Sequence, residues 1–232
     1  EKEKSHVPFG LVEYARQGFG IVSNNSAHRS TEDVPVIVPE INYHHLTILP
    51  QQQKQRGWKK GFLVVKPNCS IQSYMLPIYA LIQAGYPISK MIVTTLQALS
   101  GAGYPGVASI DIVDNIVPYI GGEEEKSEIE PGKILGKIQE GKIIPDESIK
   151  ISAHCNRVAV TDGHTACCSI QFADRKPEIE EIINIWRNFT AVPQELKLPS
   201  APVPPMIYRG EVNRPQPVKD RDAGKAMAVT VG

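Results

Sequence analysis

The chain has 232 residues, enough to bury a full hydrophobic core in one large domain or two small ones. Its 25 basic side chains (Lys and Arg) balance 25 acidic ones (Asp and Glu), so bulk charge gives no indication of binding to nucleic acid or to an anionic membrane. The 4 cysteines do not form a disulfide framework, no apolar run approaches the roughly 20 residues of a membrane-spanning helix, and no signal-peptide core follows the N-terminus, so we expect a cytoplasmic protein.

The first sixty or so residues have an α/β rhythm of short elements. Residues 8–17 predict a helix, residues 18–23 predict a turn and a short strand, and residues 34–39 predict a second short strand. The polar stretch 43–60 predicts a loop or an exposed helix. The inward face of the first helix would carry Phe9, Leu11, Val12 and Ala15. Because no Gly-x-Gly-x-x-Gly turn follows an opening strand here, a complete dinucleotide-binding unit is not visible.

A buried strand, a turn and a helix follow one another around Cys69. Residues 61–65 predict the strand, and residues 66–68 (KPN) end it because proline cannot donate to a ladder and asparagine favours turns. The helix would bury Ile71, Tyr74, Ile78, Leu81 and Ile82, and Pro77 predicts a kink or an early second helix. The helix dipole favours a thiolate at this junction. A buried apolar Cys69 and a nucleophilic Cys69 are about equally consistent with this stretch.

Three stretches follow in the middle of the chain. Residues 91–97 predict a β-branched strand that ends at Gln97. The glycine-rich residues 100–106 predict either a flexible connector or a loop whose backbone must approach a ligand closely. The charged stretch 121–135 is typical of a helix with a solvated face.

The pattern changes to strands from Ile149 onward. Residues 149–155 and 157–160 predict strands, and Asp162-Gly163 predicts a tight turn before a further strand over residues 164–172. His164 therefore lies where a strand leaves a turn, which suits an exposed and positioned imidazole.

The C-terminal part predicts one helix, a linker and a strand. The helix begins at Pro177, and its apolar face would carry Ile179, Ile182, Ile183, Trp186 and Phe189. Four prolines within residues 199–205 predict a linker, and residues 226–231 predict a final strand.

The cysteines and histidines allow two kinds of site. Cys69 could pair with His154 or His164 as nucleophile and base. A metal site is the alternative, because five potential ligands lie close together in sequence: His154, Cys155, His164, Cys167 and Cys168. The spacing argues against zinc, since Cys-x-x-Cys is missing and adjacent cysteines point to opposite faces of a strand. We therefore expect no metal.

Four motifs stand out when the chain is taken as a whole. They are residues 66–70 (KPNCS), 97–104 (QALSGAGY), 122–126 (GEEEK) and 155–164 (CNRVAVTDGH). In this order they resemble the aspartate-semialdehyde dehydrogenase family, in the variant typical of its archaeal and fungal branch. The similarity runs through nearly the whole chain and includes residues 26–29 (SAHR) and 220–225 (DRDAGK).

The resemblance implies an NADP-dependent reductive dephosphorylation of aspartyl β-phosphate to aspartate β-semialdehyde, on the path to lysine, threonine and methionine. Cys69 would be the nucleophile that forms a thioester, and His164 would be the general acid and base. Gln97 would orient the acyl intermediate, and Asn68 would lie beside the nucleophile.

The resemblance also implies the binding residues. Arg157 would bind the substrate α-carboxylate as a bidentate fork, and Glu123 would receive the amino group. Lys126 and Arg29 would hold the phosphate. The positions near the nicotinamide would be Ser100, Gly101 and Gly224. This takes Glu123 and Lys126 out of the solvated helix face and leaves Glu124, Glu128 and Glu130 on it.

The implied fold is α/β, with part of a Rossmann-type nucleotide-binding domain and a mixed-sheet catalytic domain of the glyceraldehyde-phosphate-dehydrogenase-like type. Residues 1–67 would be the C-terminal part of the nucleotide-binding domain, residues 68–206 the catalytic and dimerisation domain, and residues 207–232 a return segment to the first domain. The family's Gly-rich phosphate cradle is missing from this sequence, so we expect a fragment that binds NADP poorly on its own. We also expect a homodimer or homotetramer.

Two alternatives stay open. One is a related reductase acting on an acyl-CoA thioester of the malonyl-CoA type. Glu123 and Arg157 argue against this alternative because they match an amino-acid substrate. The other is a catalytically incomplete fragment that acts only as an oligomerisation module.

Overall fold

A computed structural model describes residues 8–232 of the chain, with the side chains described from Gly10 onward. Phe9, which we expect to face inward, lies outside the described side chains. The backbone contacts divide the chain into two compact units. Unit 1 contains the residues up to Asn68 together with Glu130–Asp146, and unit 2 contains Cys69–Ile129 and Glu147–Gly232.

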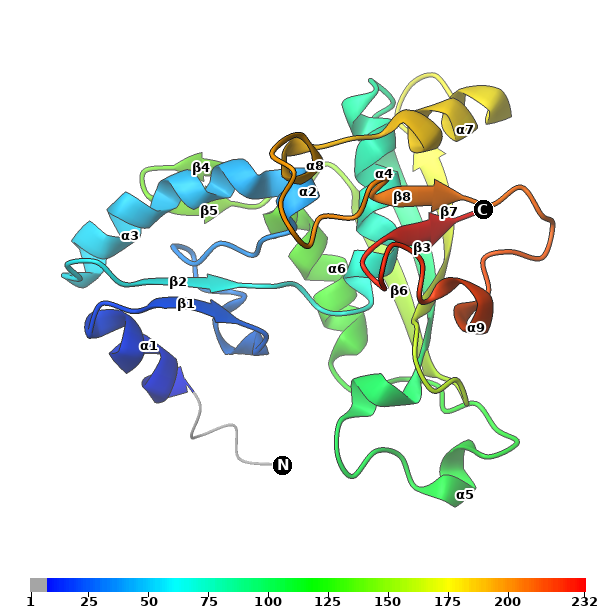
Figure 1. Ribbon diagram of the computed structural model, residues 1–232, viewed down its shortest axis with the longest axis horizontal. Helices are drawn as coiled ribbons and strands as arrows, with labels where there is room; N and C mark the ends of the chain where they lie inside the picture. Colours follow the sequence, from blue (N-terminus) through cyan, green and yellow to red (C-terminus); the bar gives the residue numbers. More distant parts are fainter. Residues whose placement is uncertain (1–7) are drawn as a thin grey trace. The chain divides into compact units, whose positions relative to one another are not determined.

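Unit 1 is built on a short parallel pair of strands. In Figure 1, β1 (Gly20–Ser23) lies beside β2 (Phe62–Val65), with Gly20 opposite Phe62 and Ser23 opposite Val65. Helix α1 (Pro8–Arg16) packs against both strands. A Cβ at Gly61 would collide with the backbone of Ala15, so a glycine is needed where the helix crosses the start of β2. The predicted first helix and the strand before Cys69 are confirmed.

The strand predicted over residues 34–39 is wrong. Only Val36 makes a bridge, to Val65, and Pro39 already begins α2 (Pro39–Asn42). The prolines at 35 and 39 explain the difference, because a proline has no N–H to donate to a ladder. A short 3-10 turn, η1 (Ser26–His28), precedes this segment.

The polar stretch 43–60 is less exposed than its composition predicts. It forms η2 (Tyr43–Ile48) and α3 (Leu49–Arg56), and His45, Ile48 and Gln52 are fully buried. The Gln52 side chain accepts a hydrogen bond from the Leu63 N–H (2.9 Å) and donates one to the Leu63 carbonyl (3.0 Å). These bonds satisfy the Leu63 backbone on the side of β2 where, among the described residues, only the bridge from Val36 to Val65 forms, which is why a glutamine is buried here.

Residues 130–146 belong to unit 1, although we expect all of 68–206 in the catalytic domain. This segment holds the end of α6 and the hairpin of β4 (Lys137–Gln139) and β5 (Lys142–Ile144). Asn42 donates to the Ile134 carbonyl (3.2 Å), and His45 Nε2 lies 2.9 Å from the Gly136 carbonyl oxygen. Buried polar side chains therefore join this hairpin to the first unit.

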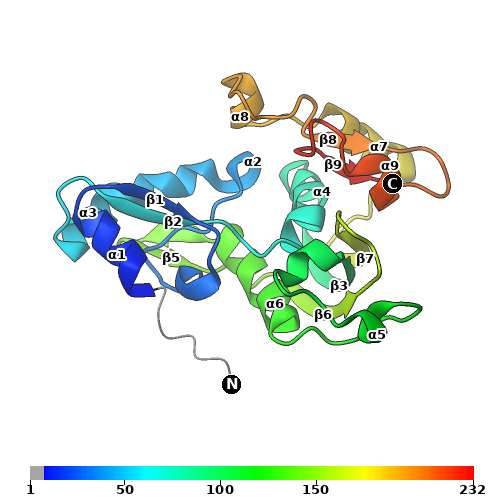
Figure 2. The same ribbon diagram turned by 60° about the horizontal axis from the view of Figure 1, so that its bottom comes forward.

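Unit 2 contains a three-stranded mixed sheet, as expected. The central strand β3 (Ile88–Gln97) pairs in parallel with β6 (Lys150–Arg157) and antiparallel with β7 (Thr165–Phe172). Figures 1 and 2 show α4 (Ile71–Gln83) and the first part of α6 (Glu123–Ile134) running beside this sheet. Helix α4 is continuous through Pro77, so the second helix that Pro77 suggests does not form.

The first turns of α6 are not simply solvated. Its residues Glu124 and Glu128 accept hydrogen bonds from the backbone N–H groups of Cys155 and Ala153, both at 3.1 Å. Because β6 is an edge strand, these carboxylates bond N–H groups that no neighbouring strand bonds. Glu128 is exposed, as expected for a solvated face. The expectation does not account for the hydrogen bonds that Glu124 and Glu128 accept from the backbone of β6.

The C-terminal part of unit 2 differs from the sequence prediction at several places. Helix α7 (Ile179–Asn188) and α8 (Val192–Glu195) precede β8 (Met206–Tyr208), which pairs in parallel with β9 (Val229–Val231). Ile179 is 67% exposed and so does not belong to the predicted apolar face, whose members Ile182, Ile183 and Trp186 are half-buried. The proline-rich residues 199–205 are no free linker, because Pro202 and Pro205 are buried within unit 2.

The final strand is also shorter than predicted. Residues 226–228 form a turn after α9 (Pro217–Asp220), and only Val229–Val231 form β9. Strand β9 packs against α4 and β8 packs against α7, so residues 207–232 pack within unit 2. Their return to a nucleotide-binding domain stays a prediction.

The segment after β3 extends away from the sheet of unit 2 in both views of the ribbon. It contains η3 (Leu99–Ala102) and α5 (Ser109–Ile112). From residue 8 to residue 232, none of the helices is long and apolar enough to span a lipid bilayer.

Candidate active site

Three predicted site residues meet at one edge of the sheet of unit 2. Gln97 ends β3 and Arg157 ends β6, and the two are register partners. Strand β7 runs the other way and begins at Thr165, opposite Leu96. His164 immediately precedes that strand, so the carboxyl ends of two strands and the start of the third bring these side chains to the same edge.

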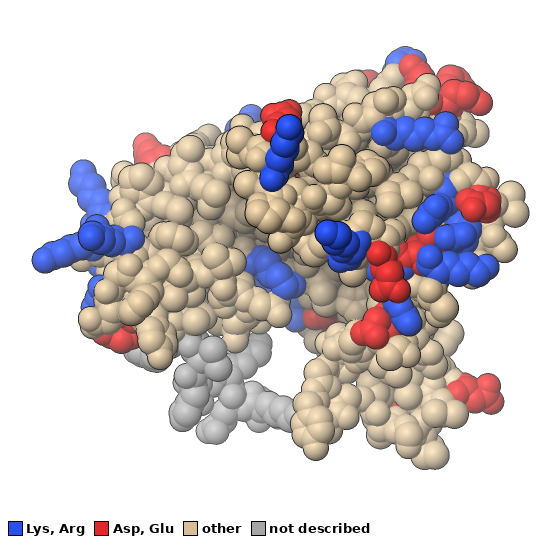
Figure 3. Space-filling view, in the orientation of Figure 1, with Lys and Arg blue, Asp and Glu red and all other residues tan. Residues whose placement is uncertain are grey.

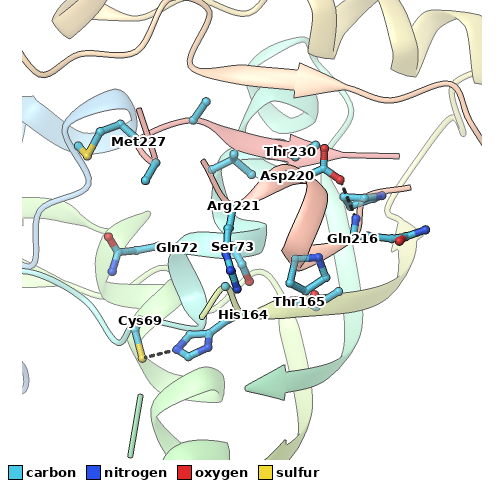
Figure 4. Close-up of a pocket in the computed structure, with 17 residues that line it drawn as sticks. Cys69, Gln72, Ser73, His164, Thr165, Gln216, Asp220, Arg221, Met227 and Thr230 are labelled. Carbon is cyan, nitrogen blue, oxygen red and sulfur yellow. Dashed lines mark hydrogen bonds between the residues drawn. The ribbon is translucent and has the colours of Figure 1, made fainter. Parts of the chain in front are cut away.

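Cys69 faces His164 across a short distance. The Cys69 Sγ lies 3.1 Å from the His164 Nε2, and Figure 4 shows both side chains at the wall of a cavity. The other ring nitrogen, Nδ1, accepts a hydrogen bond from the Ala98 backbone N–H at 2.9 Å. Of the two histidines that the sequence leaves open, His164 therefore contacts the thiol. His154 is exposed on β6, where it lies opposite Thr94.

The glycine-rich loop after β3 is fixed against the strand segment before His164. The N–H groups of Leu99 and Ser100 donate to the carbonyls of Val160 (2.7 Å) and Thr161 (3.0 Å). Residues 158–160 therefore pair with the loop and do not form the separate strand that we expect. A Cβ at Gly101 would lie 2.9 Å from His164 Cε1 and 3.0 Å from Arg157 Nη1. The loop backbone therefore lies close to two site side chains at Gly101, and its approach to a ligand stays a prediction.

A chain of polar contacts joins three other predicted site residues. Gln97 is 1% exposed, and its Nε2 donates to Glu123 Oε2 at 3.3 Å. Lys126 Nζ contacts the other oxygen of Glu123 at 2.7 Å. Arg157 is also buried, and its Nη1 donates to the Ala98 carbonyl at 2.7 Å. The side chains expected to hold the substrate are thus positioned by hydrogen bonds within unit 2.

The other two predicted binding residues lie in unit 1, where a residue that the sequence did not single out joins them. Glu130 is 7% exposed, its Oε1 contacts Arg29 Nη1 at 3.0 Å, and its Oε2 accepts the Asn68 backbone N–H at 2.6 Å. The expectation of a solvated Glu130 is wrong. Glu130 follows Glu123 by two helical turns on one face of α6, and this periodicity could have indicated its inward position.

A cavity of about 350 Å³ opens beside the thiol in unit 2. One wall is formed by Cys69, Gln72, Ser73 and residues 163–166, and the opposite wall by residues 215–217, 220–221 and 226–230. Asp220 holds the second wall together: it contacts Arg209 and Arg214 and accepts the Gln216 N–H at 2.7 Å. The Arg214 guanidinium, with these other donors, lowers the pKa of Asp220 well below its usual range.

Gly224 shapes this second wall without lining the cavity. Gly224, Lys225 and Ala226 all have positive φ (57°, 59° and 62°), so they form a left-handed turn. A Cβ at Gly224 would lie 2.8 Å from the Ala228 Cβ. Ser100 and Gly101 are exposed. Among the described residues, no group of three or more His, Cys, Asp or Glu side chains is placed to hold a metal ion.

The fold and the Cys–His pair place the chain among α/β proteins with a thiol at a strand–helix junction facing an imidazole. Residues 78–232 match the family model described as semialdehyde dehydrogenase, dimerisation domain. The chain belongs to the semialdehyde dehydrogenase family.

Curated relatives carry the more specific name of aspartate-semialdehyde dehydrogenase. The protein of this name from Archaeoglobus fulgidus is 45% identical over 94% of this chain, and that from Saccharomyces cerevisiae is 42% identical over 95%. The crystal structure of aspartate-semialdehyde dehydrogenase with NADP from Candida albicans is 38% identical over 91% of this chain, with a TM-score of 0.83. The chain spans about three fifths of the length of these proteins (61%, 63% and 61%).

Proposed function

We propose that this chain provides the catalytic part of an aspartate-semialdehyde dehydrogenase, which converts aspartyl β-phosphate to aspartate β-semialdehyde in the synthesis of lysine, threonine and methionine. The observation that supports this most is the 3.1 Å contact between Cys69 Sγ and His164 Nε2 at the cavity. A thiol and an imidazole within hydrogen-bond distance are the arrangement that covalent catalysis by cysteine requires.

The thioester is formed in one displacement. The Cys69 thiolate attacks the acyl carbon of the substrate, an S–C bond forms, and phosphate leaves with the electron pair of the broken C–O bond. Gln97 orients the acyl group, and the turn at Asn68 positions the nucleophile. Cys69 directly precedes Ser70, the N-cap of α4.

The binding residues match an amino-acid acyl phosphate. Arg157 binds the α-carboxylate, since a guanidinium presents two parallel N–H donors to a carboxylate. Glu123 binds the ammonium group, and Lys126 and Arg29 bind the phosphate. Neighbouring groups already position two of these side chains: Arg157 donates to the Ala98 carbonyl, and Glu123 accepts a hydrogen bond from Gln97. An acyl-CoA substrate carries no ammonium group for Glu123 to bind, so we place the acyl-CoA reductase second.

NADP is the cofactor that this site would use, and the chain's own residues are compatible with its nicotinamide end. The volume of the cavity beside Cys69, about 350 Å³, lies at the lower end of the range found for small-ligand pockets. Gly101, next to Ser100, approaches His164 from one side, and the left-handed turn at Gly224 shapes the wall on the other. The bound cofactor would supply the hydride that reduces the thioester, after which the S–C bond breaks and the thiolate is restored.

We also propose that the protein works as a homo-oligomer. In the central strand β3, Ile92 is 53% exposed, which is unusual for an isoleucine in the middle of a sheet. The segment around α5 exposes five further large apolar side chains, Tyr104, Ile110, Val113, Ile116 and Tyr119. Figure 3 shows almost no charged side chains over this segment. Apolar surface of this kind is typical of subunit contacts.

The test is a turnover assay in which the intact protein oxidises aspartate β-semialdehyde in the presence of phosphate and NADP. We expect Cys69→Ala to abolish NADPH formation and Cys167→Ala, which changes an exposed cysteine elsewhere on the sheet, to leave it unchanged. Mass spectrometry after acid quenching should detect an acyl adduct on Cys69. Turnover by Cys69→Ala would exclude the proposal. In the reductive direction, faster turnover of malonyl-CoA than of aspartyl β-phosphate would also exclude it.

A further inference from the structure

Glu123 and Lys126, the side chains that we assign to two different groups of the substrate, bind each other within the chain. Lys126 Nζ lies 2.7 Å from Glu123 Oε1, and the other carboxylate oxygen, Oε2, accepts a hydrogen bond from Gln97 Nε2 at 3.3 Å. Among the residues that the structure describes, Glu123 is the only carboxylate paired with Lys126. The ammonium group of Lys126 and that of an amino-acid substrate therefore compete for the same carboxylate.

The position of the pair in α6 and its partial burial make this contact strong enough to matter. Positions three apart lie on the same face of a helix, so Glu123 and Lys126 are neighbours on α6. The side chain of Glu123 is 12% exposed and that of Lys126 is 34% exposed. Water screens such a pair less than it screens a pair on an open surface, and a partly buried charge that loses its counter-ion is destabilised.

Each ligand that binds alone has to disturb this pair. An ammonium group placed on Glu123 beside Lys126 would put two cations on one carboxylate, so repulsion between like charges opposes its binding. A phosphate group placed on Lys126 would put an anion next to Glu123, and the same kind of repulsion opposes it. When both ligands are present, the ammonium group balances Glu123 and the phosphate balances Lys126, so neither side chain loses its counter-ion.

We propose that the Glu123–Lys126 pair couples the two subsites of the reaction, so that phosphate and aspartate β-semialdehyde each strengthen the binding of the other. This deepens the proposed function and rests on its assignment of Glu123 to the ammonium group and of Lys126 to the phosphate. The step is an exchange of ion-pair partners in which no covalent bond forms or breaks. It also selects against a ligand that carries only one of the two charges, because that ligand disturbs the pair without replacing both partners.

The coupling has a defined size and must act in both directions. By thermodynamic linkage, the factor by which the semialdehyde lowers the Kd of phosphate equals the factor by which phosphate lowers the Kd of the semialdehyde. Couplings between two sites are typically about 5–150-fold, and for one partly exposed ion pair we expect about tenfold.

Calorimetric titration of the intact protein tests the coupling without turnover. In the Cys69→Ala variant the aldehyde cannot form an adduct with this thiol, so inorganic phosphate can be titrated with and without saturating aspartate β-semialdehyde. We expect the semialdehyde to lower the Kd of phosphate about tenfold, and the reciprocal titration to give the same factor. Equal Kd values for phosphate with and without the semialdehyde would overturn the inference alone. Failure of both ligands to bind would overturn the proposed function as well, so the two failures are distinguishable.

Glu123→Gln in the same background separates the coupling from a simple binding role. The variant removes the competing carboxylate from Lys126, so we expect phosphate alone to bind about tenfold more tightly and the semialdehyde to change its Kd by less than about twofold. A Glu123 that only binds the ammonium group would leave the Kd of phosphate unchanged, and this result would contradict the proposal.

Glu125→Gln is the matched control, because it removes the same charge from an exposed position in the same helical turn. We expect it to change the Kd of phosphate by less than about twofold. Equal changes in the Glu123 and Glu125 variants would assign the effect to the general charge of the helix and would also contradict the proposal. The titrations in the Cys69→Ala protein decide the question even if the Glu123 variant does not fold.

Discussion

Gly101 offers the sharpest test of the site geometry, because adding one methyl group there perturbs the catalytic pair without touching the fold. Its φ is not in the left-handed region, so alanine is compatible with the backbone. The new Cβ, however, would lie 2.9 Å from His164 Cε1, 3.0 Å from Arg157 Nη1 and 3.1 Å from His164 Nε2. All three atoms belong to side chains that we place in the reaction.

The size of the effect follows from these distances. Carbon atoms in contact prefer separations of about 3.5–4.0 Å, so the imidazole must move by roughly 0.5–1 Å. A displacement of about 1 Å in a catalytic group costs roughly a hundredfold in rate. We therefore expect Gly101→Ala to lower kcat/KM for aspartate β-semialdehyde about a hundredfold, equivalent to about 2.7 kcal/mol of transition-state stabilisation.

Gly121→Ala is the matched control, since no atom lies within 4 Å of the Cβ it would add. The same assay should give the parent kcat/KM for this variant. Both variants should keep the parent midpoint of thermal unfolding to within about 2 °C, because the smaller conformational entropy of the unfolded chain offsets local crowding. A Gly101→Ala enzyme within threefold of the parent rate would refute the placement of His164 and Arg157 against this loop.

Three further predictions concern buried ionisable side chains of unit 1. Glu130→Gln should lower the free energy of unfolding by about 3 kcal/mol in chemical denaturation, because Arg29 would stay buried without its partner. Burial lowers the pKa of His45 below 6.5, so the unfolded chain binds more protons than the folded one below that pH, and urea denaturation should give a lower stability at pH 5 than at pH 7.5. Burial also lowers the pKa of Lys133 from 10.5 to about 8, so the unfolded chain retains this proton between pH 8 and 10.5 and the stability should rise by about 3 kcal/mol over that range.

Each of these predictions has its own control. Glu128→Gln changes an exposed carboxylate on the same helix and should cost well under 1 kcal/mol, so an equal loss in both variants would contradict the buried-pair argument. The acid slope should flatten in His45→Gln and persist in His154→Gln. The alkaline rise should disappear in Lys133→Met, even though that variant starts from a lower stability because the carbonyls of Arg29 and Thr31 lose their donor. A rise that survives in Lys133→Met would assign it to another group.

The sequence carries more information about the active-site edge than about the surrounding packing. Cys69, Gln97 and His164 each come where a strand or turn ends, and local patterns mark such ends well. Their meeting at one edge depends on the parallel and antiparallel order of β3, β6 and β7, which no local pattern specifies. The family resemblance implied a mixed sheet and a common site for these residues, but not that order.

The unpredicted features depend on contacts between distant segments. Gln52 and His45 read as surface residues because their polarity says nothing about which backbone groups they will bond, in this case those of Leu63 and Gly136. The first part of the strand predicted over residues 226–231 fails for a different reason, because only its last three residues form β9. Ala226 lies in a left-handed turn at a φ of 62° that its residue type disfavours, so only the surrounding structure selects it.

Helix α6 shows how one periodic segment can serve both chemistry and folding. Its first turn carries Glu123 and Lys126, joined by a 2.7 Å contact, and Glu130 follows two turns later on the same face. Glu130 bonds the backbone N–H of Asn68, the residue directly before the nucleophile, and pairs with the buried Arg29. A substitution at Glu130 should therefore affect both the unfolding free energy and the turnover rate. A Glu130→Gln variant that loses stability but retains the parent kcat/KM would show that the turn at Asn68 is positioned by other contacts.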